Sequence, residues 1–334
     1  MFKESEERQI SKEREPLTKT TWLFPGQGAQ FVGMGRELFE KDPAVRAIWE
    51  KADEILGFSI SEISFNGPAE ELNRTVNTQL ATFVDSYANM FFAKKKSDEN
   101  NDFSQPPVFV AGLSFGQYNA LVAANSLTFE DGLRLVWKRA DLTQKEAENN
   151  PAGMMAVRVA EDSRVLKDAL RQFSLDLCVV NNDELVVIGG PKTKLGEAEE
   201  WFRKQKIKTK TLNISGAFHS RLMIPVVERF TQALEKVDIK PAKIPIIANT
   251  TARPITTKEE IKEELIDHLT RTVRWRETIN YLKEQGIEKT LEFGESGVVT
   301  KINKKLLGGV AAAVTIAGIA AVIFWRHRYS QSSK

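Results

Sequence analysis

Residues 107–124 read PVFVAGLSFGQYNALVAA, and this stretch decides the fold of the chain. Pro107 to Ala111 is a short apolar run that predicts a strand, and Gln117 to Ala124 has the apolar spacing of a helix. Between them lies the pattern Gly-x-Ser-x-Gly, residues 112–116, which is typical of a sharp strand-to-helix turn. The backbone N–H after the serine and the helix N-terminus can both stabilise negative charge there. This context favours a nucleophilic Ser114 over a structural Gly-Ser turn.

The overall composition limits the chemistry. The chain has 334 residues, 42% of them hydrophobic, and a net charge of +2. This balance is typical of a globular enzyme and does not indicate nucleic-acid binding. Cys178 lies in an apolar run, which predicts a buried side chain. Because it is the single cysteine, no disulfide can form within the chain. No Cys/His cluster or metal-binding helix pattern occurs, so we predict no metal site.

A serine nucleophile of ordinary pKa needs a base, and the chain has three histidines to supply it. His219 is the best candidate, because it lies among small residues after a predicted strand, where a loop can reach back to Ser114. His268 is expected on a helix, where a partly exposed surface imidazole is the alternative role. His327 lies beyond an apolar segment and is set aside.

Upstream of the serine, the sequence predicts a strand, a turn and two helices. The strand Thr21 to Phe24 ends at Pro25-Gly26-Gln27-Gly28, a turn whose two glycines give unusual backbone freedom. Helical spacing follows at Val45 to Leu56 and at Leu80 to Phe92. The charged, Asn-rich stretch from Lys94 to Gln105 predicts an exposed loop.

Residues 151–212 have a different pattern. Strands and helices are expected in the order βαββαβ, at 154–159, 163–173, 175–180, 184–189, 192–205 and 207–212. This order is that of a ferredoxin-like unit. The sequence around it favours a larger α/β domain with a parallel sheet, formed by residues 21–150 and 213–305, into which the small unit is inserted. Residues 1–20 are highly charged and predict a solvated N-terminal arm.

Leu306 to Trp325 is an uncharged, Ala-rich run with basic residues on both sides, followed by a basic tail at 326–334. About 20 apolar residues are enough for one membrane-spanning helix. A buried terminal helix is the alternative, but flanking cations and the interfacial Phe324-Trp325 pair favour a membrane span. We therefore predict a catalytic domain in the cytoplasm, anchored to a membrane by its C-terminal tail.

Several motifs, in the same order, resemble those of malonyl-CoA:acyl carrier protein transacylases and the related discrete acyltransferases of polyketide synthesis. The resemblance covers roughly residues 20 to 305. It is carried by Phe24 to Gly28 (FPGQG), Gln79 in a Thr-Gln motif, the serine turn Gly112 to Gly116, Arg139 downstream of it, and Gly216 to Ser220 (GAFHS).

The resemblance implies an α/β-hydrolase-like large domain with an inserted ferredoxin-like domain, and ping-pong acyl transfer without a metal or redox cofactor. Ser114 would be acylated by a coenzyme A thioester with His219 as base, and the backbone N–H groups of Gln27 and Phe115 would bind the oxyanion. Arg139 would bind the free carboxylate of a malonyl group, in a pocket that Gln79 also lines. The acceptor would be the phosphopantetheine thiol of an acyl carrier protein. A backbone carbonyl or amide, and not a carboxylate, would orient the base.

The chain also departs from the family pattern. Leu113 replaces the usual histidine, Phe115 a leucine, Gln117 a glutamate and His268 a glutamine, so Leu113 and His268 would change the polar lining of the pocket. Two alternatives therefore stay open: an acyl hydrolase that clears stalled chains from polyketide carrier proteins, and a non-catalytic scaffold that binds carrier proteins. Arg139 favours transfer of a diacid, because a hydrolase of varied monoacids has no use for a buried cation.

Overall fold

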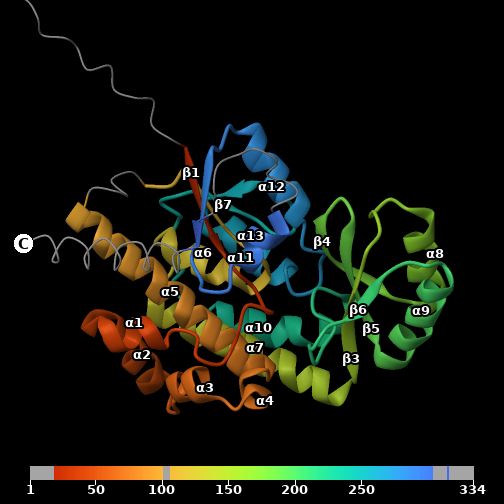
Figure 1. Ribbon diagram of the computed structural model, residues 1–334, viewed down its shortest axis with the longest axis horizontal. Helices are drawn as coiled ribbons and strands as arrows, with labels where there is room; N and C mark the ends of the chain where they lie inside the picture. The colour runs from red at the N-terminus through yellow and green to blue at the C-terminus, as the bar shows by residue number, and fades with distance from the viewer. Residues whose placement is uncertain (1–18, 101–105, 304–313, 316–334) are drawn as a thin grey trace, which may run out of the picture.

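The computed structural model describes residues 19–100, 106–303 and 314–315 and shows two lobes side by side (Figure 1). The larger lobe is built around a six-stranded sheet, and the smaller lobe around a four-stranded sheet. The predicted N-terminal arm, apart from residues 19 and 20, and the basic tail at 326–334 lie outside the described residues.

The six-stranded sheet has the order β10-β9-β1-β2-β7-β8. All neighbours are parallel except β7 and β8. The strands are β1 Thr20–Phe24, β2 Phe109–Gly112, β7 Ile246–Ile247, β8 Pro254–Ile255, β9 Lys289–Glu292 and β10 Val314–Thr315. The central strands β1 and β2 are almost fully buried, as expected of apolar runs covered on both faces. Phe24 is in register with Gly112, so the loops that follow these two strands leave the sheet together.

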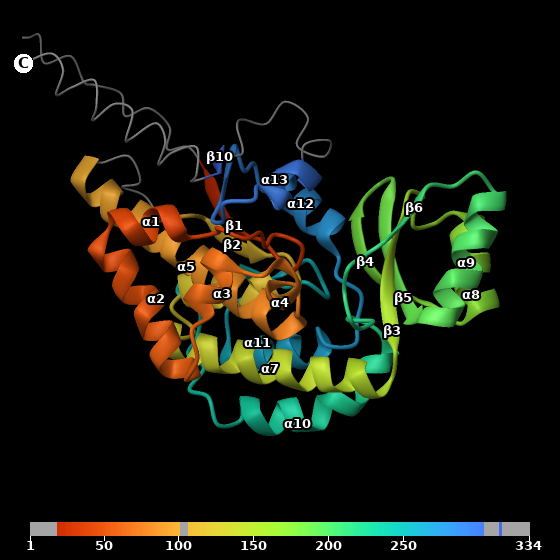
Figure 2. The ribbon, with the colours of Figure 1, turned by 60° about the horizontal axis from the view of Figure 1, so that its bottom comes forward.

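Most helices belong to the larger lobe. They are α1 Arg36–Lys41, α2 Pro43–Leu56, α3 Ile60–Asn66, α4 Ala69–Leu72, α5 Thr75–Asn100, α6 Gln117–Ala123, α7 Phe129–Asn149, α10 Ile224–Leu234, α11 Lys258–Asp267, α12 Trp275–Glu284 and α13 Val298–Asn303. Two short 3-10 turns, Ser114–Gly116 and Arg221–Met223, precede α6 and α10. Figure 2 shows α7 and α10 side by side along one edge of this lobe, with α1 to α4 grouped around α5.

The smaller lobe contains β3 Ala152–Val157, α8 Arg164–Phe173, β4 Asp176–Asn182, β5 Leu185–Pro191, α9 Lys192–Lys204 and β6 Thr209–Thr211. These elements occur in the order expected from the sequence. The strands form an antiparallel sheet of order β4-β5-β3-β6, and α8 and α9 lie together on its outer face (Figure 2). A separate hydrophobic cluster, including Val157, Phe173 and Phe202, fills the space between the sheet and its helices.

The chain segment after α11 joins the two lobes. Val273 of this segment forms an isolated parallel bridge with Val179 of β4. The Val273 N–H donates to the Cys178 carbonyl at 2.9 Å, and the Val273 carbonyl accepts from the Val180 N–H at 2.9 Å. The Thr272 hydroxyl also donates to the Leu177 carbonyl at 2.6 Å. The small sheet therefore continues, through backbone hydrogen bonds, into the large lobe.

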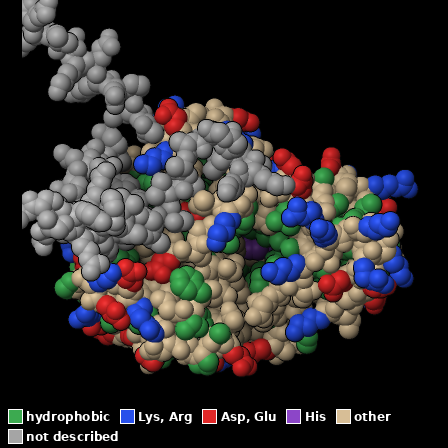
Figure 3. Space-filling view, in the orientation of Figure 1, with side chains coloured by type: hydrophobic (Ala, Val, Ile, Leu, Met, Phe, Trp, Pro, Cys, Tyr) green, Lys and Arg blue, Asp and Glu red, His purple; other side chains and the backbone are tan. Residues whose placement is uncertain are grey.

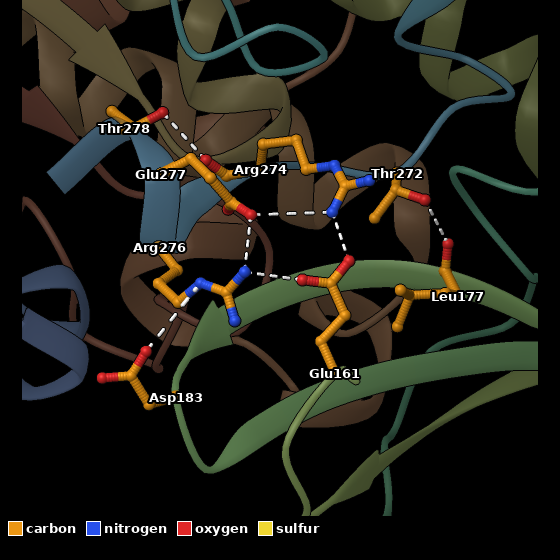
Figure 4. Close-up of polar contacts among 8 residues, drawn as sticks. All are labelled: Glu161, Leu177, Asp183, Thr272, Arg274, Arg276, Glu277 and Thr278. Carbon is orange, nitrogen blue, oxygen red and sulfur yellow. Dashed lines mark hydrogen bonds and ion pairs between the residues drawn. The ribbon is translucent and has the colours of Figure 1, made fainter. Parts of the chain in front are cut away.

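An ionic cluster strengthens the same junction (Figure 4). Glu161, from the loop after β3, contacts Arg274 and lies 2.6 Å from the Arg276 guanidinium. Glu277 of α12 lies 2.7 Å from Arg276 and 3.6 Å from Arg274. Because two carboxylates and two guanidinium groups alternate, each charge at the junction has an opposite neighbour.

The prediction of an exposed loop at 94–105 is wrong for residues 94–100. Helix α5 continues to Asn100, and residues 101–105 lie outside the described residues. Lysine and glutamate are good helix formers, so a charged segment can extend a helix whose preceding turns pack against the core.

The predicted tail anchor is also wrong. Within the predicted span 306–325, the structure describes Val314 and Thr315, and these residues form strand β10, paired in parallel with β9. The rest of that span lies outside the described residues. Among residues 19–100, 106–303 and 314–315, no helix has the length and apolar character needed to cross a membrane. A membrane-spanning segment at 306–325 would need a continuous helix, and the extended pair Val314–Thr315 interrupts it. The predicted transmembrane helix is therefore wrong, and so are the membrane association and the membrane localisation that were inferred from it.

Candidate active site

The turn at residues 112–116 has the sharp geometry that its glycines predict. A side chain at Gly112 would overlap the Gly116 backbone, and a Cβ at Gly116 would lie 2.5 Å from the Pro25 carbonyl oxygen. Ser114 itself has a φ of 55°, a left-handed conformation that is unfavourable for a residue with a side chain. The serine is therefore held at the tip of the turn, between β2 and α6.

Ser114 and His219 are brought together across 105 positions of sequence. The serine Oγ lies 2.6 Å from His219 Nε2, and His219 Nδ1 lies 2.7 Å from the His268 carbonyl oxygen. A carbonyl oxygen only accepts, so Nδ1 carries the proton and Nε2 is free to accept the serine hydroxyl. The imidazole thus has the tautomer that a general base requires.

His219 is 3% exposed. Burial is the main cause that lowers its pKa, to about 3; the positive charge of Arg139 acts in the same direction, and the His268 carbonyl opposes both. The imidazole is therefore neutral at physiological pH and available to accept a proton.

Arg139 of α7 is a buried cation, 1% exposed, whose pKa is lowered mainly by burial. Its Nη1 donates to the side-chain oxygen of Gln79, on α5, at 2.7 Å. Its Nε has no hydrogen-bond partner among the described residues. A buried guanidinium whose nearest partner is a neutral amide leaves its charge uncompensated, and an anionic ligand would compensate it.

The loop after β1 lies against the serine turn. The Leu113 N–H donates to the Phe24 carbonyl at 2.9 Å, and a Cβ at Gly26 would lie 3.4 Å from Ser114 Cβ. Gln27 follows directly, and its side-chain amide atoms are buried without a hydrogen-bond partner in the described part of the chain. The structure thus brings the turn that contains Gln27 close to Ser114 and Phe115.

Leu113 and His268, the two departures from the family pattern that were expected to change the pocket lining, both lie at this site. Leu113 is buried immediately before the serine. His268 is fully buried at the C-terminal cap of α11, with its ring centroid 4.7 Å from that of His219. Neither ring nitrogen of His268 has a hydrogen-bond partner among the residues described. The alternative of an exposed surface imidazole is therefore wrong.

Asn249, two residues after the end of β7, was not among the predicted site residues. Its Oδ1 accepts from the Ser114 N–H at 2.9 Å, and its Nδ2 donates to the Gly112 carbonyl at 2.9 Å and to the Gln117 side-chain oxygen. One signal was available: a polar residue directly after a predicted parallel strand lies at the same sheet edge as a serine that follows another strand.

A cavity of about 490 Å³ opens beside the base and includes His219, Thr250 and Arg271 in its lining. Figure 3 shows the surface hollowed between the lobes, with histidine at the bottom of the hollow. Cys178 is fully buried, as expected, and burial raises the pKa of its thiol. Within the described ranges, no group of three or more His, Cys, Asp or Glu residues could hold a metal ion.

A serine on a strand-to-helix turn, hydrogen-bonded to a buried histidine and near a buried arginine, is the arrangement expected of an acyltransferase. The sequence model of the acyl transferase domain family matches residues 21–318. The chain belongs to this family.

Individual relatives agree with this assignment. The chain is 37% identical over 300 residues to the malonyl CoA-acyl carrier protein transacylase of Bacillus subtilis, covering 87% of this chain and 92% of that protein. The crystal structure of FabD from Acinetobacter baumannii superposes with a TM-score of 0.82 at 30% identity, covering 90% and 94% of the two chains. PlMCAT, solved with the type II PKS acyl-carrier protein AntF, gives a TM-score of 0.82 at 28% identity, covering 89% and 96%.

Proposed function

We propose that the protein transfers a malonyl group from coenzyme A to the phosphopantetheine thiol of an acyl carrier protein, through an ester on Ser114. The observation that carries this proposal is the 2.6 Å contact between Ser114 Oγ and His219 Nε2, beside the buried Arg139. The names of the relatives support the same donor and acceptor.

In the first half-reaction, His219 Nε2 removes the proton of the Ser114 hydroxyl as its oxygen attacks the thioester carbonyl carbon. The carbon–sulfur bond then breaks, and the imidazolium returns the proton to the departing coenzyme A thiolate. The hydrogen bond from Nδ1 to the His268 carbonyl holds the ring in place during both proton transfers. The carrier thiol reverses these steps in the second half-reaction and leaves with the malonyl group.

The negative oxygen of each tetrahedral intermediate needs donors. We assign this role to the backbone N–H groups of Gln27 and Phe115, because the loop after β1 packs on the serine turn. One donor of this kind typically lowers the barrier by about 3 kcal/mol. No metal ion or redox cofactor is needed in this scheme, since a thioester is already an activated acyl donor.

Arg139 is proposed to bind the free carboxylate of the malonyl group, with Gln79 holding the guanidinium from one side. Binding has a second effect. Because the charge of Arg139 lowers the pKa of His219, a carboxylate that neutralises this charge makes His219 a stronger base. A diacid would thus activate its own acylation. Leu113 and His268 would line the rest of the acyl pocket.

The hydrolase alternative uses the same Ser114 and His219 but has no use for a buried cation next to them. The scaffold alternative does not need a neutral imidazole in hydrogen-bond contact with a serine. The transferase is therefore the function that the site and the relatives favour together.

The deciding experiment follows labelled malonyl-CoA with and without a holo carrier protein. We expect a labelled enzyme in the absence of the carrier, and labelled carrier when the carrier is added. Ser114→Ala should form neither. Release of free malonate without any labelled carrier would favour the hydrolase, and the lack of any labelled enzyme would favour the scaffold.

The finer description of the fold is also a proposal. The order β4-β5-β3-β6 with two helices on one face supports a ferredoxin-like domain at 151–212. The parallel strands and the serine turn after β2 support an α/β-hydrolase-like domain formed by 21–150 and 213–305. The cavity next to His219 is lined by residues of both units, which supports an active site between them.

A further inference from the structure

Glu264 of α11 is a buried carboxyl group, 4% exposed, that accepts hydrogen bonds from the loop that follows β7. It accepts from the Asn249 N–H at 2.7 Å, from the Thr250 N–H at 3.2 Å and from the Thr250 hydroxyl. These donors are neutral, and no salt bridge to Glu264 occurs within the described ranges. A buried carboxyl group without a cation costs stability, so its role needs an explanation.

The loop held by Glu264 in turn holds the serine turn. The single side chain of Asn249 is hydrogen-bonded to Gly112, Ser114 and Gln117, and so spans the turn from its first residue to the start of α6. Ser114 is in an unfavourable left-handed conformation, which persists only where its surroundings hold it. Glu264 accepts hydrogen bonds from the backbone N–H groups of Asn249 and Thr250. It therefore fixes the position of the Asn249 side-chain amide.

The same helical turn also reaches the base. The His268 N–H donates to the Glu264 carbonyl at 2.8 Å, and the His268 carbonyl accepts from His219 Nδ1 at 2.7 Å. One end of α11 therefore connects to the nucleophile through the Glu264 side chain and to the base through the His268 carbonyl.

We propose that Glu264 is a positioning residue that sets the distance between Ser114 Oγ and His219 Nε2, and that acylation requires its ionised form. This inference rests on the proposed acyl transfer and adds the residue that regulates it. Glu264 acts through Asn249 and does not touch the substrate in this scheme.

The ionisation of Glu264 falls in the physiological range. Burial raises its pKa to about 7, although hydrogen bonds from Thr250 and Asn249 act in the opposite direction. The groups that face it are Thr250, Asn249 and Gln117, all neutral, and Tyr118 of α6, whose own pKa is raised so that it stays protonated. An ionised carboxylate accepts from every donor around it, whereas a protonated one places a hydrogen where a donor already points.

We therefore expect the rate of acyl-enzyme formation by the wild-type protein to rise with pH, with a midpoint near 7. His219, whose pKa is about 3, does not change its charge in this range. The rate constant is measured by rapid quench with labelled malonyl-CoA from pH 5.5 to 9. A midpoint that belongs to Glu264 must disappear when its side chain can no longer ionise.

Glu264→Gln is the principal variant. We expect a rate constant about 10- to 100-fold lower at pH 8, a KM within about 3-fold of wild type, and no midpoint near 7. The matched control is Glu263→Gln, an exposed neighbour on the same helix, which should keep both the wild-type rate and the midpoint. If Glu264→Gln formed the acyl-enzyme at the wild-type rate, or kept the pH midpoint near 7, the proposal would be overturned.

Thr250→Val keeps the inference testable if Glu264→Gln does not fold. Loss of the hydroxyl donor makes the carboxylate harder to form, so the midpoint should move up by about 0.5 to 1 pH unit. A midpoint that does not move contradicts the proposal. Failure of the wild-type protein to form any acyl-enzyme would instead disprove the proposed function itself, which keeps the two failures distinct.

Discussion

At the scale of single residues, both members of the proposed catalytic pair have unfavourable backbone conformations. Ser114 has a φ of 55° and His219 a φ of 61°. Strain of this kind typically costs about 1 to 3 kcal/mol per residue. The hydrogen bond from the Ser114 N–H to Asn249 Oδ1 and the one from His219 Nδ1 to the His268 carbonyl offset this cost. The backbone strain therefore accompanies the geometry that keeps Ser114 Oγ and His219 Nε2 2.6 Å apart.

Replacement of Arg139 should change substrate selection more than folding. In Arg139→Ala, we expect the kcat/KM for malonyl-CoA to fall by at least about 30-fold, since a lost charged contact in a buried site is worth about 2 kcal/mol or more. The kcat/KM for acetyl-CoA should fall much less. The measurement is acyl-enzyme formation with each thioester.

Arg134→Ala is the matched control, because Arg134 is exposed on the same helix and forms an ion pair with Asp131 at 3.7 Å. Its selectivity should equal that of the wild type. An equal loss for malonyl-CoA and acetyl-CoA in Arg139→Ala would rule out a carboxylate-binding role.

The buried His219 should make the protein less stable in acid. Its pKa is about 3 when folded and about 6.5 when unfolded, so between these values only the unfolded chain takes up the proton. Stability is therefore lost as pH falls below about 6.5. Between pH 6.5 and 5, His219→Gln should lose about 2 kcal/mol less free energy of unfolding than the wild type. Urea denaturation at the two pH values measures this, and equal losses would contradict the depressed pKa.

At the scale of elements, α2 shows how local sequence and a tertiary contact combine. Asp42 precedes the helix, accepts from the Ala44 and Val45 N–H groups at 2.9 and 3.2 Å, and pairs with Lys95 of α5 at 2.9 Å. Pro43 follows at the first helical position, and Gly57 ends the helix in a left-handed conformation. These signals explain why α2 begins and ends where its sequence predicts, within two residues.

Asp42→Ala should destabilise the protein by about 1 kcal/mol at pH 7, mainly through the lost helix cap. Burial would raise the pKa of Asp42, but Lys95 and the two N–H groups outweigh it, so the pKa lies below its usual value. The contribution of Asp42 is therefore complete above about pH 4 and is lost as pH falls through the lowered pKa. Urea denaturation at pH 7 and pH 3 should show a larger difference from wild type at pH 7 than at pH 3. Glu37→Gln, which removes an exposed pair with Lys41, should match the wild type at both pH values.

At the scale of the whole molecule, the junction between the lobes contributes Leu177, Thr272 and Arg274 to the lining of the cavity beside His219. The segment from Thr272 to Arg276 binds β4 through its backbone and Glu161 through two arginines (Figure 4). It begins four residues after His268, whose carbonyl orients His219. The position of the small lobe is thus coupled to the position of the base.

Glu161→Gln should weaken this junction by about 1 kcal/mol, because partly exposed ion pairs contribute little each but Glu161 serves two arginines at once. We expect earlier cleavage within residues 151–212 in limited proteolysis and a lower kcat in malonyl transfer. Asp183→Asn is the control: Asp183 lies 3.9 Å from Arg276 and is largely exposed, so its loss should have little effect. Equal effects of the two variants would contradict the assigned role of Glu161.

The sequence by itself determined the features that depend on neighbouring residues. The serine turn, the elements of residues 151–212 and most core strands follow from glycine spacing and apolar periodicity, which act over a few residues. His219 was found because only three histidines were available.

Only the tertiary structure decided what depends on contacts between distant segments. Glu264 lies 150 positions from Ser114 and acts on it through Asn249, a chain of contacts that no local pattern reveals. His268 is buried because α11 packs behind the site, and Val314 and Thr315 form a strand because β9 offers them a sheet edge. Hydrophobicity alone does not distinguish a sheet-edge strand from a membrane helix; the available partner does, and the partner is set by the fold.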